Sequence, residues 1–367
     1  MITPLFELVA IEVHAEGEPG RVITNAAGLV RGDSMRERFA YCQDHLDGLR
    51  RAILREPRGY PSLCAVFLLP PVNPGSDFGI IVLEQGGFTP MSGSNTMCAV
   101  TAALEAGIVP ITGSITEVTI DTAVGTVKAL AHVEDGKVTS VTIHNVPSFV
   151  VGLDTPLDVP EYGTVRADIL FGGQFFAQVR AADLGLRLDP DNGRELVRAG
   201  ALIKLAAQQQ LHLAHPLNPE LDRVNLVMLH DGDRTPGQDS HNTVVLTNGD
   251  LDPDRSETWT GALDRSPCGT GTSARMAALH SRGQLEIGED FVHHSIIGST
   301  FIGRLTGTTE IGGTPAVCPT ITGHTWVTGH STWMLDPTDP YPQGYTVGDI
   351  WAPQNRTDVT APLDTRA

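Results

Sequence analysis

Two short segments, half a chain apart, hold the residues best suited to chemistry. The first reads Pro-Met-Ser-Gly-Ser-Asn-Thr and contains Ser92, and the second reads Pro-Cys-Gly-Thr-Gly-Thr and contains Cys268. Each runs into an alanine-rich stretch, and these stretches predict helices over 95–106 and 272–282. A hydroxyl and a thiol are therefore each expected beside the unpaired N–H groups at a helix amino terminus.

The two segments also align with one another. At a constant offset of 176 residues, Ser92 falls on Cys268. Four pairs of identical residues coincide at the same offset: Gly93 with Gly269, Thr96 with Thr272, Ala102 with Ala278 and Gly107 with Gly283. The offset is about half of the chain, which is too long for a solenoid repeat. It indicates two related domains, each supplying one copy of the same local structure.

The chemistry predicted for this paired structure is proton transfer on a small carboxylate. A helix amino terminus attracts anions, so two such loops facing one another would hold a carboxylate between Ser92 and Cys268. A helix amino terminus can also lower the pKa of a thiol from about 8.5, which makes Cys268 a candidate thiolate base. Ser92 fits a hydrogen-bonding proton relay. Asp264, four residues before Cys268, is either a turn residue or an acceptor for a substrate ammonium.

Taken singly, these features have ordinary explanations. A Ser-Gly or Cys-Gly step before a helix is usually a cap, and a cysteine is usually a small buried hydrophobic residue. The register between the two copies is what favours a chemical role for Ser92 and Cys268.

The elements that must position these segments are of mixed type. Helices are also predicted over 34–55 and 192–210, and Asp135-Gly136 between apolar alternations predicts a hairpin turn. Strands are predicted over 5–13, 65–69, 79–84, 117–121, 126–133, 138–144, 164–170, 175–179, 223–230 and 242–247. Because strands and helices do not alternate regularly, the pattern favours an α+β fold over a doubly wound parallel sheet.

Composition limits the classes of function. The 367 residues predict two domains, and 25 Lys+Arg against 43 Asp+Glu give a net charge of −18, which argues against binding nucleic acid or an anionic membrane. The beginning of the chain lacks the pattern of a secretory signal, and no apolar run reaches 18 residues. The five cysteines are too few and too scattered for a disulfide framework. We therefore expect a cytoplasmic protein.

The quoted residues resemble the proline racemase family, which includes 4-hydroxyproline 2-epimerases and trans-3-hydroxy-L-proline dehydratases. Residues 264–272, Asp-Arg-Ser-Pro-Cys-Gly-Thr-Gly-Thr, are similar to the second catalytic motif of the family. Ser92 lies where the family has Cys or Thr, followed by Gly-His. Further similarity is found at 14–21, 171–176 and 295–299 and in the Asp-Pro pairs 336–337 and 339–340.

The resemblance implies the diaminopimelate epimerase-like fold. This fold has two pseudo-symmetric α/β domains, each with a curved sheet around a central helix, and an active site in the cleft between them. We expect the first domain at 1–147, completed by 330–367, and the second at 148–329. The resemblance does not decide whether the protein is a monomer or a homodimer.

The resemblance also implies proton chemistry at Cα without a metal, pyridoxal phosphate or a nicotinamide. In the racemases two cysteines flank Cα, one removing the proton and the other returning it to the opposite face. The N–H groups around Gly93, Ser94, Gly269 and Thr270 would hold the substrate carboxylate, and Asp264 would hold the ring nitrogen.

Two departures from the family pattern guide the choice of reaction. Ser92 replaces a catalytic cysteine, and Ser94 replaces the family histidine. Dehydration needs only one strong base, so we expect a trans-3-hydroxy-L-proline dehydratase that forms Δ1-pyrroline-2-carboxylate and has trans-4-hydroxy-L-proline 2-epimerase side activity. The alternative within the family is mainly a 4-hydroxyproline 2-epimerase, and the alternative of another class is a non-catalytic imino-acid binding protein.

Two further readings find little support in the sequence. The pairs His212 with His215 and His293 with His294 lack a recognisable metal-ligand framework, so no metal is expected. A cysteine hydrolase would need a histidine oriented on Cys268, and no signature for one is present.

Overall fold

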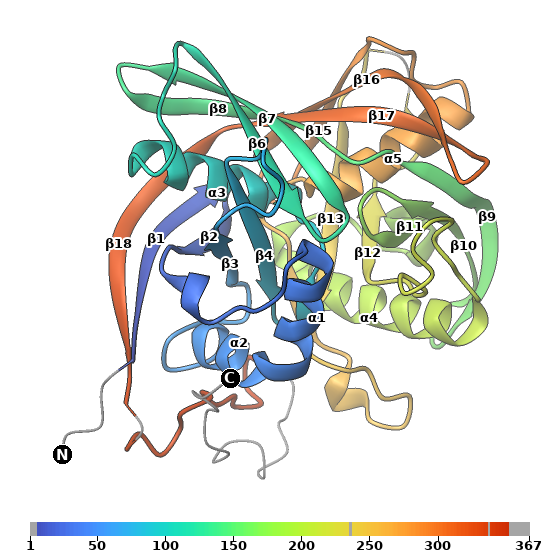
Figure 1. The fold of residues 1–367 in the computed structure, drawn as a ribbon. Coiled ribbons are helices and arrows are strands. Elements are labelled where there is room, and N and C mark those ends of the chain that lie inside the picture. Colours follow the sequence, from blue (N-terminus) through green and yellow to red (C-terminus); the bar gives the residue numbers. More distant parts are fainter. Residues whose placement is uncertain (1–5, 235–236, 337, 352–367) are drawn as a thin grey trace. The chain divides into compact units, whose positions relative to one another are not determined.

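The structure of the chain is a computed structural model that describes residues 6–234, 237–336 and 338–351 (Figure 1). It divides into two compact units, which we call unit 1 (Met1–Val141 with His324–Ala367) and unit 2 (Thr142–Gly323). The domain boundaries expected from the sequence lie six residues further along the chain in both cases. Pro337 and the segment 352–367, both named in the sequence-based expectations, lie outside the described residues.

Unit 1 is built on a mixed sheet in the order β18–β1–β2–β3–β4–β6–β7. The β2–β3 and β4–β6 pairs are parallel, the others are antiparallel, and the short β5 pairs with β4. The strands are β1 (Phe6–Ala15), β2 (Glu18–Ile23), β3 (Cys64–Leu69), β4 (Phe78–Glu84), β5 (Gly87–Thr89), β6 (Ile115–Thr122), β7 (Gly125–Glu134) and β18 (Thr325–Leu335). β8 (Lys137–His144) runs from unit 1 into unit 2.

Unit 2 is built on a second mixed sheet in the order β9–β10–β11–β12–β13–β15–β16–β17. The β11–β12 and β13–β15 pairs are parallel, and the short β14 pairs with β13. The strands are β9 (Phe149–Val159), β10 (Gly163–Phe171), β11 (Phe175–Arg180), β12 (Leu226–His230), β13 (Ser240–Thr247), β14 (Gly261–Leu263), β15 (Asp290–His294), β16 (Thr300–Ile311) and β17 (Thr314–Gly323).

The two units repeat one succession of strand pairings. In each, two antiparallel pairs lead to a parallel pair, then an antiparallel pair, then a second parallel pair. By this succession β4 corresponds to β13 and β6 to β15. The strand topology therefore repeats in the same way as the two alanine-rich segments.

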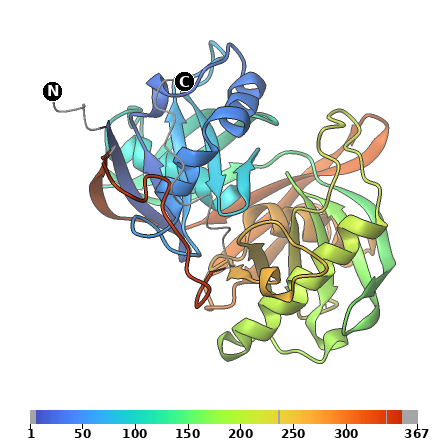
Figure 2. The ribbon, with the colours of Figure 1, turned by 90° about the horizontal axis from the view of Figure 1, so that it is seen from below.

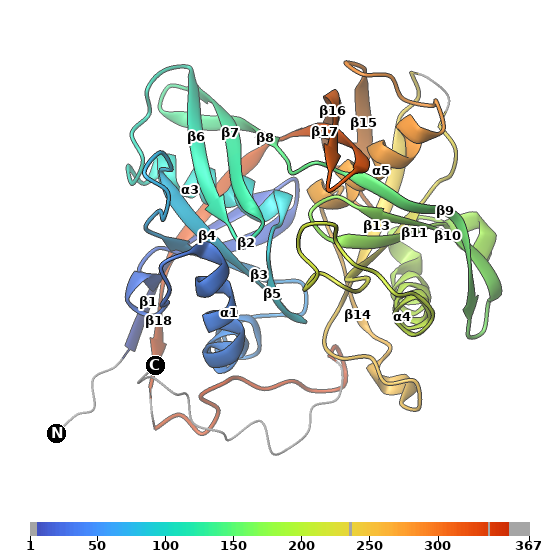
Figure 3. The ribbon, with the colours of Figure 1, turned by 45° about the vertical axis from the view of Figure 1, so that its right-hand side comes forward.

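Each unit has one central helix, α3 (Gly93–Glu105) in unit 1 and α5 (Gly269–Ser281) in unit 2. Every residue of α3 up to Leu104 and of α5 up to Leu279 is buried. α3 contacts β1, β2, β3, β4, β7 and β18, and α5 contacts β9, β10, β11, β16 and β17 (Figures 1 and 3). A helix enclosed by strands on several sides cannot keep a polar face, so both are rich in small residues such as Ala, Gly and Thr.

The remaining helices cover outer faces of the sheets. In unit 2, α4 (Gly193–Gln210) packs against β9, β12 and β13 (Figure 2). In unit 1, the single helix predicted over 34–55 is wrong, because the chain breaks at Leu46 into α1 (Met35–His45) and α2 (Asp47–Leu54). Gly48, a poor helix former, lies two residues after the break, and Arg50 of α2 donates to the carbonyls of Glu84 (2.7 Å) and Gln85 (2.6 Å).

Most other predicted elements are confirmed. Each predicted strand overlaps an observed one, although β12 begins three residues later than predicted and Leu5 lies outside the described residues. The predicted turn between β7 and β8 is present, with positive φ at both Asp135 and Gly136. In the part of the chain that the structure describes, no helix is long and apolar enough to cross a membrane.

Candidate active site

Ser92 is the N-cap residue of α3 and lies in an ordinary extended conformation. Its hydroxyl is nearly buried and accepts a hydrogen bond from Asn95 Nδ2 at 3.0 Å, and Ser94 Oγ lies 3.5 Å away. The carbonyl of Ser92 accepts from the N–H of Thr96 at 2.9 Å and from its hydroxyl at 2.7 Å. Ser92, Gly93 and Ser94 thus lie together at the start of the central helix of unit 1.

Cys268 is the N-cap residue of α5, and its backbone is unusual. Its φ of +63° lies in the left-handed region, where residues other than glycine are uncommon and strained by about 1–3 kcal/mol. The side chain is 5% exposed and packs among apolar residues that include Phe176, Met228 and Val244. Cys268 Sγ lies 3.7 Å from Thr270 Oγ1. The thiol is thus held at the start of the central helix of unit 2.

Asp264 organises the loop that precedes Cys268. Its Oδ1 accepts hydrogen bonds from the N–H and from the hydroxyl of Ser266, both at 2.8 Å. The same hydroxyl oxygen accepts from the N–H of Cys268 at 3.1 Å. These bonds give Asp264 the role of a turn residue, one of the two roles expected for it. Ser266 was missed by sequence reasoning, although it lies inside the quoted motif.

Both helices begin earlier than predicted. α3 begins at Gly93 rather than at residue 95, and α5 at Gly269 rather than at residue 272. The predicted loops are therefore the first turns of the helices, because Thr96 and Thr272 already donate their N–H groups to the carbonyls of Ser92 and Cys268. The three N–H groups before each threonine have no acceptor within the helix, which is the property that binds anions.

Two glycines allow close packing at the first turn of α5, Gly172 against backbone and Gly271 against side chains. A Cβ on Gly172, in the turn between β10 and β11, would lie 2.2 Å from the carbonyl oxygen of Thr270 and 2.7 Å from the N atom of Ala274. A Cβ on Gly271 would lie 3.2 Å from Cys268 Sγ. Asn145 Nδ2 donates to the carbonyl of Gly172 at 2.9 Å, which ties the turn in place. The segment 171–176 therefore supports the Cys268 loop through backbone contact.

The segment 295–299, the next of the quoted similarities, supports the same loop. Ser295 Oγ and Ser299 Oγ lie 2.7 Å apart, and Ser299 Oγ donates to the carbonyl of Arg265 at 3.3 Å. Arg265 directly follows Asp264. This segment of unit 2 therefore contacts the loop that carries Cys268.

The segment 14–21 belongs to unit 1. His14 stacks on Trp326 with ring centroids 4.9 Å apart, and its Nδ1 accepts from the N–H of Gly17 at 3.1 Å. Burial lowers the pKa of His14, with the Glu16 carboxylate opposing that effect. Glu16 Oε1 accepts from His324 Nδ1 at 2.7 Å. These contacts describe a structural role for His14 at the β1–β2 turn.

The thiols of Cys42 and Cys98 differ from Cys268 in position and chemistry. Both are completely buried within α1 and α3 rather than at a helix amino terminus. Burial raises the pKa of Cys42 to about 12 and raises that of Cys98 further, where the Glu18 carboxylate adds to the effect. Both thiols are therefore protonated at neutral pH and cannot serve as bases.

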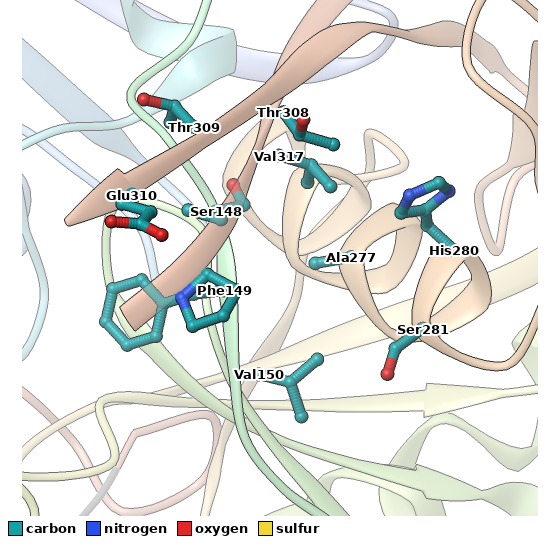
Figure 4. A pocket seen from close by; sticks show the side chains of 12 residues that line it. Ser148, Phe149, Val150, Ala277, His280, Ser281, Thr308, Thr309, Glu310 and Val317 are labelled. Atoms are coloured by element: carbon teal, nitrogen blue, oxygen red, sulfur yellow. The ribbon is translucent and has the colours of Figure 1, made fainter. Parts of the chain in front are cut away.

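Unit 2 also contains a pocket of about 620 Å³ at the carboxyl-terminal half of α5 (Figure 4). His280 and Ser281 line it from the helix, Phe149 and Val150 from β9, and Glu310 from β16. None of the site residues predicted from the sequence lines this pocket. It is therefore a separate feature from the Cys268 loop, which lies at the other end of the helix.

His215, His293 and His294, from the two histidine pairs, contact other groups of the protein. His215 packs against Phe171, with ring centroids 4.6 Å apart, and burial lowers its pKa. His293 is fully buried and bonds two protein side chains. Within the described ranges, no group of three or more His, Cys, Asp or Glu residues is placed to hold a metal ion.

Comparison with known proteins places the chain in a family. The family model described as proline racemase matches residues 10–346. The chain belongs to the proline racemase family. Among its relatives, a 4-hydroxyproline 2-epimerase of Streptosporangium roseum is 40% identical over 92% of this chain and 97% of the relative. Proline racemase A of Trypanosoma cruzi is 38% identical over 92% of this chain and 81% of the relative.

Solved structures agree with this assignment. A hydroxyproline epimerase from Agrobacterium vitis, crystallised with trans-4-hydroxy-L-proline, has a TM-score of 0.86 and 36% identity over 94% of this chain and 97% of its own. A phenazine biosynthesis protein of the PhzF family from Bacillus anthracis shares the fold alone, with a TM-score of 0.56 and 12% identity over 89% of this chain and 99% of its own. The α+β, diaminopimelate epimerase-like fold expected from the sequence is confirmed.

Membership of the proline racemase family also bears on the expected reaction. The relatives are named epimerases and racemases, so the family of enzymes that act on amino acids is confirmed. These names favour the alternative, 4-hydroxyproline 2-epimerase, over the dehydratase that the sequence analysis placed first.

Proposed function

We propose that this proline racemase family member catalyses the 2-epimerisation of 4-hydroxyproline by proton transfer at Cα. The observation that carries the proposal is the thiol of Cys268, held at the amino terminus of a buried helix in a strained conformation. The 40% identical relative named 4-hydroxyproline 2-epimerase supports the substrate class, as does the similar structure that holds trans-4-hydroxy-L-proline.

The substrate carboxylate is held by backbone N–H groups in this proposal. The donors are those of Gly93 and Ser94 on α3 and of Gly269 and Thr270 on α5, all in first turns without intrahelical acceptors. The protein has a net charge of −18, so its overall field repels a carboxylate. Capture must then be local, and the two helix amino termini supply it.

Cys268 removes the α-proton of the L-epimer as a thiolate and leaves a carbanion next to the carboxylate. Ser92 donates its hydroxyl proton to the opposite face of Cα and regains a proton from solvent, while Cys268 releases the proton that it took to solvent. Asn95, which donates to Ser92 Oγ, stabilises the oxygen while it is deprotonated. Asp264 accepts a hydrogen bond from the ring ammonium while it holds Ser266. The reaction needs only groups of the protein and solvent.

Dehydration of trans-3-hydroxy-L-proline is a second candidate, and Ser92 is the observation that favours it. A serine hydroxyl is a much weaker acid than a thiol and is not ionised at neutral pH, so a Ser92/Cys268 pair is less suited to two-sided proton transfer than two cysteines. In dehydration, Cys268 takes the α-proton, the C3–O bond breaks, and the 3-hydroxyl leaves as water with a proton from solvent, to which Cys268 later releases the proton that it took. The resulting enamine tautomerises to Δ1-pyrroline-2-carboxylate. A 4-hydroxyl is not β to the carbanion, so it cannot be eliminated.

Proton NMR in D₂O with proline, trans-3-hydroxy-L-proline and trans-4-hydroxy-L-proline tests both candidate reactions. We expect trans-4-hydroxy-L-proline to lose its α-proton signal and to yield its 2-epimer. If the second activity is present, trans-3-hydroxy-L-proline gives an imine that reacts with o-aminobenzaldehyde. Exchange confined to proline would contradict the substrate class. Retention of the α-proton in all three would contradict an enzymatic function and favour the imino-acid binding protein.

A further inference from the structure

A line of buried hydrogen bonds leads from β13 to the peptide group in front of Cys268. Asn242 Nδ2 lies 2.9 Å from His293 Nε2, and His293 Nδ1 lies 2.8 Å from Thr272 Oγ1. Thr272 Oγ1 lies 3.0 Å from the carbonyl oxygen of Pro267. Asn242, His293 and Thr272 are all fully buried. We call these three side chains the Asn242–His293–Thr272 chain.

The direction of each bond in this chain is fixed by its neighbours. The carbonyl of His294, which can only accept, lies 3.3 Å from Asn242 Nδ2. The side-chain amide of Asn242 is therefore oriented with its nitrogen toward this carbonyl and toward His293 Nε2, which accepts. The neutral ring then carries its proton on Nδ1 and donates it to Thr272 Oγ1. Burial, together with the Arg275 guanidinium, holds the pKa of His293 well below its usual value, which favours this neutral form. The Thr272 hydroxyl proton is left for the carbonyl of Pro267.

Thr272 therefore holds both peptide groups that flank Cys268. Its hydroxyl donates to the carbonyl of Pro267, before Cys268, and its N–H donates to the carbonyl of Cys268 itself at 2.8 Å. These two peptide planes define the φ and ψ of Cys268. A residue other than glycine keeps a positive φ only where its surroundings over-determine the backbone, and the two bonds from Thr272 do so here.

Unit 1 lacks this arrangement at the equivalent positions. Both the N–H and the hydroxyl of Thr96 donate to the single carbonyl of Ser92, whose φ of −143° is unstrained. In the β13–β15 ladder Ser240 pairs with His293, whereas the corresponding β4–β6 ladder pairs Phe78 with Ile120 and Gly79 with Asp121 and contains no histidine. The hydrogen-bonded chain occurs together with the strained cysteine and not with the relaxed serine.

We propose that Asn242, His293 and Thr272 are positioning residues that hold Cys268 in its left-handed backbone conformation and thereby aim its thiol at the substrate. The inference rests on the proposed role of Cys268 as the base. None of the three needs to touch the substrate. Their effect on the reaction comes through the direction of the Cys268 side chain, so it appears in kcat more than in KM.

The first test compares Thr272→Val with Thr272→Ser in the exchange of the substrate α-proton. Thr272→Val removes the hydroxyl with little change in shape, and a thiol displaced by about 1 Å is expected to lower kcat about 10²-fold with KM nearly unchanged. Thr272→Ser keeps the hydroxyl and should restore kcat to within a few-fold of the wild type. His293→Leu removes the ring nitrogen that contacts Thr272 Oγ1 and should resemble Thr272→Val.

Thr101→Val is the matched control. Thr101 is a buried threonine of α3 whose hydroxyl lies 2.6 Å from Thr325 Oγ1, away from the loops of the proposed site. Its substitution should lower Tm by an amount similar to Thr272→Val and leave kcat unchanged. The positioning role is overturned if Thr272→Val lowers kcat no more than Thr101→Val does. In that case the activity of Cys268→Ser tests the proposed base separately. An inactive variant supports Cys268 as the base, and an active one contradicts it.

A second measurement does not depend on activity. Glycine accepts a positive φ, so Cys268→Gly removes the strain while the hydrogen-bonded chain is intact. In the Thr272→Val background Cys268 is free to relax, so there is little strain for Cys268→Gly to remove. We expect the change in Tm caused by Cys268→Gly to be more favourable with Thr272 in place than in the Thr272→Val background. Equal changes in the two backgrounds would overturn the inference.

Discussion

The close approach of Gly172 to α5 makes Gly172→Ala an informative perturbation. The added Cβ would lie 2.2 Å from the carbonyl oxygen of Thr270 and 2.7 Å from the N atom of Ala274, whereas real Cβ atoms essentially never come closer than 3.0 Å. Both contacts are backbone atoms of a buried helix, so no flexible side chain can move aside. The turn and the helix must separate by close to 1 Å.

Two effects of that separation can be measured. Overpacking of a core by a methyl group costs about 1–3 kcal/mol, which for a unit of this size lowers Tm by about 2–12 °C. The first turn of α5, which would be displaced, contains Thr270 and directly follows Cys268. A misplacement of about 1 Å can lower the rate of a reaction about 10²-fold. We therefore expect Gly172→Ala to lose stability and to lose still more activity, measured by thermal unfolding and by exchange of the substrate α-proton.

Gly249→Ala is the control for this perturbation. Gly249 has no atom within 4 Å of the position that its Cβ would take, and its φ is not in the left-handed region. It should retain the wild-type Tm and rate. If Gly172→Ala behaves like Gly249→Ala, the packing of the β10–β11 turn does not position the Cys268 loop.

Three further predictions concern single residue types. Ser92→Ala should slow inversion of trans-4-hydroxy-L-proline more than it slows α-proton exchange, and Ser92→Cys should speed inversion; an unchanged ratio of the two rates by NMR would contradict the relay. The thiols of Cys42 and Cys98, whose pKa values are raised by burial, should react with Ellman's reagent at pH 8 only after denaturant is added, and rapid reaction in the folded protein would contradict their placement. Burial lowers the pKa values of His230 and His293, so below about pH 6.5 the unfolded chain binds more protons than the folded chain. The free energy of unfolding should therefore be at its full value above about pH 6.5 and should fall below that pH, by up to about 1.4 kcal/mol per histidine per pH unit. Urea unfolding that is independent of pH between 6.5 and 5.5 would contradict this prediction.

Local signals in the sequence predicted much of the site. Ser92 and Cys268 are the N-caps of the two central helices, and the constant offset between them matches a repeated strand topology. The Asp135-Gly136 turn followed from its residue types alone. These features depend on neighbours a few residues away, which is why a sequence pattern can report them.

Long-range packing accounts for what the sequence did not predict. Arg50 reaches carbonyls about 35 residues along the chain, and His293 reaches Thr272 and Asn242 across 21 and 51 residues. The strands β16, β17 and β18 were not predicted because glycine occurs within all three and β17 also contains two prolines, residue types that weaken a strand pattern. No periodicity in the sequence reports long-range contacts such as those of Arg50 and His293.

The central claim is that Cys268 removes the α-proton. Incorporation of deuterium at Cα of trans-4-hydroxy-L-proline in D₂O tests it, with Cys268→Ser compared with Cys318→Ser, a partly exposed cysteine of β17. A positioned general base contributes roughly 10²–10⁴ in rate, so Cys268→Ser should lose at least about 10²-fold in exchange while Cys318→Ser exchanges at the wild-type rate. Exchange by folded Cys268→Ser at the wild-type rate would contradict the assignment of the base.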